Sequence, residues 1–284
     1  MFDRRAKNAE IFKDTEQMYR SNKILKEVIK NSIQNQKLIL VNDVMEFELT
    51  NEREGKVVVS GKRTLEASES YAKQGKRVCV LNFASATNPG GGVVHGSSAQ
   101  EEAICRCSTL YPCLNTREMW NNFYTPHRNA DNPLYNDDCI FTPAVKVFKG
   151  DTNFPETLLE TDWWNVDVIT CAAPNLRRIP SNYMNPNSGS KQADTTYEGL
   201  KALHTRRIQR IFEVALANEA DVLILGAFGC GAFCNPPELV AEVFAEFTEK
   251  YCKYFDVIEY AVFHTERETK NYKAFKEALK RLER

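Results

Sequence analysis

Residues 77–102 read RVCVLNFASATNPGGGVVHGSSAQEE. The first seven residues are mostly apolar and rich in valine, which is typical of a buried strand, and three adjacent glycines follow at 90–92. Ligands of open α/β sheets bind beyond the carboxyl ends of strands, and glycine lacks the Cβ that would keep a ligand away from the backbone. The stretch therefore predicts a strand that leads into a ligand-binding loop.

The same pattern of an apolar strand followed by an amphipathic helix recurs along the chain. Strands are expected at 166–174, 220–229 and 255–264, and helices at 192–217, 236–253 and 268–283. Shorter strands are expected at 37–41, 45–50 and 55–61, a helix at about 64–75, and one or two helices within 5–34. This alternation predicts an α/β fold: a three-layer α/β/α sandwich with a mixed, largely parallel central sheet.

We interpret residues 1–284 as a single catalytic domain on which an N-terminal helical extension, approximately residues 1–60, is packed. The net charge and the apolar content of the chain bear on which partners it can bind. The formal net charge of -1 provides no global field that would attract nucleic acid or an anionic membrane, and no apolar run is long enough to span a bilayer. The nine cysteines follow no disulfide framework, so we expect a cytoplasmic protein, and we expect a monomer.

Two adjacent glutamates follow the glycines at the start of an expected helix. Ser98 and Glu101 have the spacing of a capping box, with Ser98 as the N-cap, and Glu102 then lies in the first helical turn. The helix dipole would lower the pKa of Glu102, whereas burial or the neighbouring Glu101 would raise it. The sequence leaves that competition open.

A second glycine-rich loop, LILGAFGCGAFCNPPELV at 223–240, also follows an expected strand. Asn235 as N-cap and Pro236 at the first helical position predict a helix start. Backbone N–H groups that converge ahead of a helix favour an anion. Together, two such loops at one edge of a sheet can hold a diphosphate and the sugar attached to it.

These residues carry a resemblance to a known family. GGGVVHGSSAQEE resembles the signature of poly(ADP-ribose) glycohydrolases, and GAFGCGAF is similar to their diphosphate-binding loop. With NFASATNPGGG, the chain looks most like the microbial type, which has a macrodomain fold. The resemblance implies cleavage of ribose–ribose O-glycosidic bonds in poly(ADP-ribose), from chain ends, with release of ADP-ribose. It implies no cofactor and no metal.

The resemblance also implies roles for individual residues. Glu102 would be the general acid and then the base, and Glu101 would hold sugar hydroxyls. The substrate-binding residues would be Asn88, Gly90, Gly91, Gly92, Gln100, Gly229, Cys230, Gly231, Ala232 and Phe233. The partners would be ADP-ribose, poly(ADP-ribose) and ADP-ribosylated macromolecules.

Two other functions fit the same loops. A module that binds ADP-ribose without cleaving it would share the fold and both glycine loops, although the two glutamates argue against it. A hydrolase that removes a single ADP-ribose from protein or nucleic acid would use the same pocket with another leaving group. The segment 172–178 is a candidate for the adenine side of the cleft, and the polar segment 182–194 is a candidate mobile loop over it.

Overall fold

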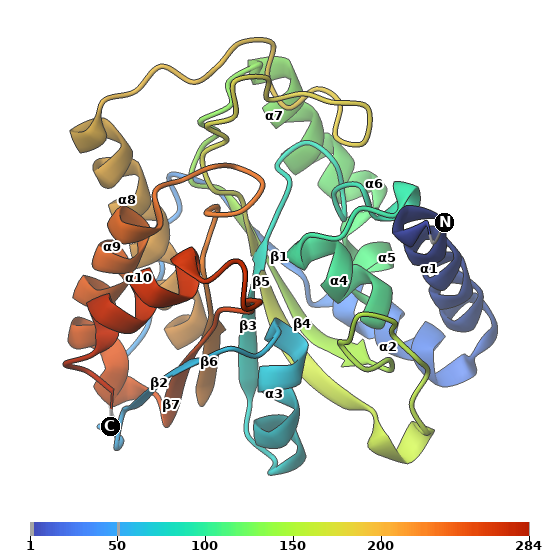
Figure 1. Cartoon of the computed structure of the whole chain (residues 1–284). Coiled ribbons are helices and arrows are strands. Elements are labelled where there is room, and N and C mark those ends of the chain that lie inside the picture. Colours follow the sequence, from blue (N-terminus) through green and yellow to red (C-terminus); the bar gives the residue numbers. More distant parts are fainter. Residues whose placement is uncertain (1–2, 50–51, 284) are drawn as a thin grey trace.

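The computed structural model describes residues 3–49 and 52–283, and a seven-stranded sheet forms its centre (Figure 1). The strands lie in the order β1-β4-β5-β3-β6-β7-β2. The β1–β4 and β4–β5 pairs are antiparallel and the remaining pairs are parallel, so the predicted mixed, largely parallel sheet is confirmed. The strand bounds are β1 Lys37–Ile39, β2 Lys56–Ser60, β3 Val78–Phe83, β4 Cys139–Val147, β5 Trp164–Cys171, β6 Val222–Leu225 and β7 Val257–Ala261.

Helices cover both faces of this sheet (Figure 1). One face carries α8 Tyr197–Ala217, α9 Pro237–Tyr251 and α10 Lys270–Leu279. The other face carries α1 Arg4–Ser21, α2 Lys23–Gln34, α3 Thr64–Lys73, α4 Gln100–Cys107, α5 Leu110–Leu114, α6 Arg117–Met119 and α7 Thr125–Ala130. Short turns of 3-10 helix, η1 Val93–His95, η3 Glu160–Asp162 and η4 Cys252–Tyr254, and one π-helical turn, η2 Trp120–Tyr124, join them.

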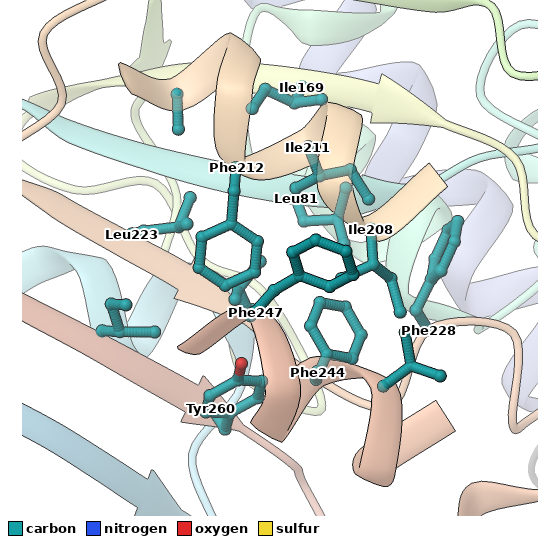
Figure 2. Close-up of a cluster of buried hydrophobic side chains, with 14 of the residues drawn as sticks. Leu81, Ile169, Ile208, Ile211, Phe212, Leu223, Phe228, Phe244, Phe247 and Tyr260 are labelled. Atoms are coloured by element: carbon teal, nitrogen blue, oxygen red, sulfur yellow. The ribbon is translucent and has the colours of Figure 1, made fainter. Parts of the chain in front are cut away.

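Two apolar layers hold the helices to the sheet. On the α8–α9 side, Leu81 of β3 and Ile169 of β5 lie in one cluster with Phe212 and Phe244 (Figure 2). These side chains are fully buried, as the near-continuous apolar strands predicted. On the opposite face, Ile104 of α4 packs in a second cluster that fixes the start of α4 against the sheet. Both walls of the site described below therefore rest on buried core.

Two strand predictions were wrong. β4 was not foreseen because its alternation is interrupted: Pro143 and Ala144 form an irregularity, Ala144 has φ +53°, and the register shifts between Thr142 and Val145. Conversely, residues 45–49 form no strand, and residue 50 lies outside the described residues. The apolar–polar alternation there occurs in a largely exposed segment that connects the two edges of the sheet and lies outside it.

The N-terminal residues contribute both helices and strands. Asn8 of α1 donates from Nδ2 to the Gly96 carbonyl over 3.1 Å, and Thr15 donates to the Arg106 carbonyl over 2.6 Å. β1 and β2 form the two edges of the sheet. The helical N-terminal segment is therefore present and packs directly against the loop that follows β3.

None of the helices formed by the described residues combines the length and the apolar character needed to cross a membrane.

Candidate active site

The two glycine-rich loops leave the same edge of the sheet. β3 and β6 pair in parallel, and they end at Phe83 and Leu225. Because parallel strands have their carboxyl ends on one edge, the loops 84–99 and 226–236 start side by side. The central position of β3, between β5 and β6, creates the crevice in which such sheets bind ligands.

Gln100 fixes the first turn of α4 to the end of β3. Its Oε1 accepts from the Phe83 N–H over 2.8 Å, and its Nε2 donates to the Leu81 carbonyl over 2.7 Å and to Thr64 Oγ1 over 3.0 Å. The predicted capping box is wrong, because the residue before α4 is Ala99 and no side chain caps the helix. The amide of Gln100, not Ser98, holds the start of α4 in place.

Both oxygens of Glu101 accept hydrogen bonds from the protein. Its Oε2 accepts from the Ser85 N–H over 2.7 Å, and its Oε1 accepts from Asn82 Nδ2 over 3.3 Å. The side chain is buried, and Asn82 in turn donates to Thr170 on the neighbouring strand. Glu101 is therefore held rigidly between β3 and the loop that follows it.

Glu102 differs from its neighbour in having one oxygen without a partner. Its Oε1 accepts from the Gly92 N–H over 2.9 Å. Its Oε2 is buried and has no hydrogen-bond partner among the described residues. Glu102 lines the cleft, and this oxygen is the one carboxyl atom of the pair that lacks a partner among the described residues.

Burial decides the competition that the sequence left open. It raises the pKa of Glu102, and the Gly92 N–H lowers that pKa by less. The pKa of Glu101 is raised well above its ordinary value, first by burial and then by the charge of Glu102. Two adjacent buried carboxyls do not ionise together easily, so burial and mutual repulsion both favour a protonated form of the pair.

The first glycine loop lies directly against these carboxyls. Gly90 and Gly91 have φ values of +66° and +57°, a region that other residues rarely adopt. A Cβ on Gly91 would lie 2.5 Å from Glu102 Oε1 and 3.1 Å from Glu101 Oε2. Glycine at position 91 is therefore required by the fit between the loop and the two glutamates.

Asn88 is engaged by the protein and does not line the cleft. Its Nδ2 donates to Asn185 Oδ1 over 2.6 Å and to the Pro186 carbonyl over 3.0 Å, and its Oδ1 accepts from Arg128. Met184 Cβ lies 3.2 Å from the position that a Cβ on Gly92 would take. Part of the 182–194 segment thus packs over the first glycine loop, on the side where it was expected.

The second glycine loop presents unpaired donors. The N–H groups of Gly231, Ala232 and Phe233 have no acceptor among the described residues. Gly231 has open space around the position of a Cβ, with no heavy atom within 4 Å. Three consecutive free N–H groups form a concave site that suits an anion.

Asn235 closes this loop and does not cap α9. The cap is Pro236 and the first helical residue is Pro237, one position later than predicted. Asn235 Nδ2 donates to the Gly229 carbonyl over 3.0 Å, and its Oδ1 pairs with Nε2 of the buried His204 over 2.9 Å. Burial lowers the pKa of His204 to about 4, so this side chain is neutral at pH 7 and donates to Asn235.

A cleft of about 920 Å³ lies between the two loops. Of the residues predicted for the site, eight line it: Gln100, Glu101, Glu102, Gly229, Cys230, Gly231, Ala232 and Phe233. Asn88 and Gly90, Gly91 and Gly92 are not among the lining residues. From the segment 172–178, only Ala173 lines the cleft, so the structure does not bring Arg177 or Arg178 to it.

Several lining residues were missed, and Arg63 and Phe263 are two of them. The ring of Phe263 is 49% exposed, and the Arg63 guanidinium lies 3.9 Å from its centroid. Arg63 follows β2 and Phe263 follows β7, at the carboxyl ends of two strands that pair in parallel. The strand-end rule could have found both. In the described part of the chain, no cluster of three or more His, Cys, Asp and Glu side chains is placed to hold a metal ion.

The family follows from comparison with known proteins. Residues 6–150, about half of the chain, match the model of the microbial-type PARG catalytic domain, where PARG denotes poly(ADP-ribose) glycohydrolase. The chain belongs to the microbial-type poly(ADP-ribose) glycohydrolase family. The matched residues include the first glycine loop and both glutamates. A comparison with curated proteins finds no match.

Solved glycohydrolase structures resemble this one over nearly the whole chain. A poly(ADP-ribose) glycohydrolase from Thermomonospora curvata bound to the inhibitor ADP-HPD is 28% identical, with a TM-score of 0.79, and the match covers 96% of this chain and 99% of that one. A Deinococcus radiodurans glycohydrolase in complex with ADP-ribose is also 28% identical, with a TM-score of 0.75, covering 89% and 97%. The α/β fold with its N-terminal helices is thus that of the glycohydrolases.

Proposed function

We propose that this chain hydrolyses the ribose–ribose O-glycosidic bonds of poly(ADP-ribose) and releases ADP-ribose. The observation that carries the proposal is the free Oε2 of buried Glu102 in a cleft whose opposite wall presents unpaired N–H groups. Membership of the glycohydrolase family supports it, as do solved relatives that bind ADP-ribose and an ADP-ribose-like inhibitor.

The ligand lies across the cleft between the two loops. Its diphosphate accepts hydrogen bonds from the N–H groups of Gly231, Ala232 and Phe233, because two negative charges suit a row of free donors. Its terminal ribose lies at Glu101 and Glu102, with Phe233 against the sugar. The first glycine loop contacts these two glutamates at Gly91. A ribose contact to Asn88 requires that Asn88 exchange its bonds to the 182–194 segment.

The adenine lies at the far end of the cleft. Phe263 offers an exposed aromatic face there, and the guanidinium of Arg63 stacks on the same ring. Aromatic and guanidinium faces both stack well on a purine. This position replaces the 172–178 segment, which we had expected on the adenine side.

Glu102 performs the proton transfers. Every other oxygen of the pair accepts an N–H, so Glu102 Oε2 is the oxygen that can carry the catalytic proton without loss of a hydrogen bond. From there it passes to the departing 2′-oxygen as the bond to the anomeric carbon breaks through an oxocarbenium-like state. A water then attacks the anomeric carbon and gives a proton back to Glu102, which leaves ADP-ribose and a shortened chain with a free 2′-hydroxyl.

Glu101 orients the sugar. Its two oxygens are already fixed by Ser85 and Asn82, and carboxylate oxygens have further lone pairs that can accept from ribose hydroxyls. The two glutamates therefore have different partners and different tasks, and only one of them transfers a proton.

We propose that cleavage takes place at chain ends. A cleft of about 920 Å³ has the size of a site for one small-molecule ligand, hence for one ADP-ribose unit and not several. We further propose a macrodomain-type fold, a cytoplasmic location and a monomer; the irregular spacing of nine free cysteines supports a reducing compartment.

One experiment tests the activity and its leaving group together. The purified protein is mixed with labelled poly(ADP-ribose) and, separately, with a mono-ADP-ribosylated protein, and the products are followed in time. We expect ADP-ribose from the polymer from the earliest times and little release from the modified protein. Early release of oligomers would overturn chain-end cleavage. Consumption of the modified protein alone would indicate a mono-ADP-ribosyl hydrolase. Binding without turnover would indicate a module that binds ADP-ribose without cleaving it.

A further inference from the structure

An exposed aromatic pair, Tyr183 and His95, lies beside the first glycine loop. The side chain of Tyr183 is 85% exposed, and its ring centroid lies 5.2 Å from that of the exposed His95, with 47° between the planes. The two rings together form an exposed aromatic surface, and neither residue has a part in the chemistry described above. Val94, next to His95, is also exposed.

This pair is anchored to the glycine that binds Glu102. The Gly92 N–H donates to Glu102, and the Gly92 carbonyl accepts from the His95 N–H over 3.0 Å. On the other side, Met184, the neighbour of Tyr183, packs over Gly92 and accepts from Ser97 through its sulfur. The aromatic pair is therefore linked through Gly92 to the loop that contacts Glu102.

Two arginines stand at the start of α1, whose main chain contacts the residue after His95. Arg4 and Arg5 at the start of α1 are exposed, and the ion pairs among the described residues involve neither side chain. The main chain of Arg5 touches Gly96, directly after His95. Figure 1 shows the start of α1 and the loop that contains residues 181–190 on the same side of the molecule. The nearby acids are engaged: Asp3 accepts from the N–H of Arg5, and Glu10 pairs with Lys7.

The chemistry of the substrate identifies what would use this surface. In poly(ADP-ribose) the leaving oxygen belongs to the ribose of an adenosine, which carries a purine base and a diphosphate. When the terminal unit fills the cleft, that adenosine must emerge near Glu102. A base needs an aromatic face, and a diphosphate needs cations.

We propose that Tyr183 and His95, together with Arg4 and Arg5, form an outer subsite that binds the leaving unit of the polymer. The adenine of that unit stacks on Tyr183, and its diphosphate lies by the two arginines. This inference rests on the proposed function, because it assumes that the terminal unit occupies the inner cleft. The outer subsite gives the enzyme a preference for polymer over ADP-ribose attached to a small group.

Binding to a protein that cannot turn over isolates the subsite. In the Glu102→Gln background, calorimetry compares ADP-ribose, which fills only the inner cleft, with a dimer of two ADP-ribose units, which also reaches the outer subsite. We expect the dimer to bind about tenfold more tightly, as for one added base stack. Adding Tyr183→Ala should remove most of that advantage and leave the affinity for ADP-ribose unchanged, whereas Tyr183→Phe should keep it.

Two further variants sharpen the result. Arg4→Gln with Arg5→Gln should reduce the advantage of the dimer and weaken its dependence on salt. Tyr197→Ala, at another exposed tyrosine on α8, should change neither affinity. Equal affinities for dimer and monomer, or an advantage that survives Tyr183→Ala, would overturn the subsite. Failure of both ligands to bind would instead overturn the proposed function.

Discussion

The two glycine-rich loops have similar composition and opposite uses of their backbone. In the first loop the N–H groups serve the protein: Gly91 donates to the Asn88 carbonyl, and Gly92 donates to Glu102. In the second loop the N–H groups of Gly231, Ala232 and Phe233 have no acceptor in the described chain. One loop holds carboxyls in place, and the other leaves its donors for a ligand.

The glycines differ in the same way. A Cβ on Gly91 would meet the two glutamates, and its φ is positive, whereas a Cβ on Gly231 would enter open space. The fold therefore requires glycine at position 91, whereas it would accept any small residue at position 231. The comparison teaches that a glycine beside a cleft has to be judged by what a Cβ would touch.

The largest effect is expected from the side chain that the first loop holds. Glu102→Gln keeps the shape and the bond from Gly92 but removes the acid, so the rate of polymer hydrolysis should fall by at least about 10²-fold. ADP-ribose binding should persist, since the donors of the second loop remain. Turnover assays and calorimetry on the same sample check this, and near-normal turnover would remove Glu102 from its role.

Gly231→Val tests the second loop alone. The valine side chain would occupy the space in front of the free N–H groups and displace the diphosphate from at least two charge-assisted hydrogen bonds. Affinity for ADP-ribose should therefore fall by about 10²-fold or more. Thermal unfolding should be nearly unchanged, because the new Cβ has no heavy atom within 4 Å. If the variant binds ADP-ribose at the original affinity, this loop does not bind the diphosphate.

Gly91→Ala is the matched change in the first loop and should act mainly on the fold. Backbone strain at positive φ costs about 1–3 kcal/mol of unfolding free energy, and the new Cβ must also displace Glu102. Chemical denaturation should show the loss, with Gly231→Ala as the stable control. If both alanine variants unfold alike, the two loops do not differ as described.

A smaller effect should appear as pH dependence near the first loop. Because burial raises the pKa of Glu102 when folded, the folded protein keeps a proton that the unfolded chain releases. Its contribution to stability is fully present below the unfolded pKa of about 4.3 and is lost as pH rises through the folded pKa. From pH 4 to pH 8, the Tm of the parent should therefore fall relative to the Tm of Glu102→Gln. A constant difference would contradict the shift.

The second loop should show the opposite pH trend. His204 has a pKa of about 4 when folded, against an ordinary value of 6.5. Its contribution to stability is present above the ordinary value and is lost as pH falls toward 4. His204→Gln can still donate to Asn235 but cannot be protonated, so its Tm should fall less than the parent's between pH 7 and pH 5. If the two curves of Tm against pH run parallel, protonation of His204 does not contribute to the loss of stability at acid pH.

Much of this architecture could be predicted from local pattern. The strands at 78–83, 164–171, 222–225 and 257–261 and the helices that follow them are apolar runs and periodic segments of the right lengths. β4 escaped prediction because Pro143 and Ala144 break its alternation, and 45–49 mimicked a strand by chance alternation outside the sheet. Both errors arise where pairing partners, which are distant in sequence, decide the conformation.

The candidate site, like the fold, could be predicted from the sequence only in part. The Gln-Glu-Glu motif and both glycine loops were visible in the sequence, but Arg63 and Phe263 reach the cleft only because β2 and β7 pair at its edge. Gln100 was expected to bind substrate, which stays a prediction; the structure adds that its amide holds α4 to β3. Ser98 and Asn235 were expected to cap helices and do not, since cap spacing in a sequence ignores the tertiary partners that compete for these side chains.

The sequence by itself determined the family, the α/β alternation and the two loops, because residue type and short-range period are local properties. Tertiary structure alone decided which backbone amides remain free, which oxygen of Glu102 has no partner, and whether burial or the helix dipole prevails on its pKa. Each of these depends on groups brought together from distant segments, such as Gly92 with Glu102 and Asn235 with His204. Hydrogen bonding and desolvation act over a few ångströms in space, whatever the separation along the chain.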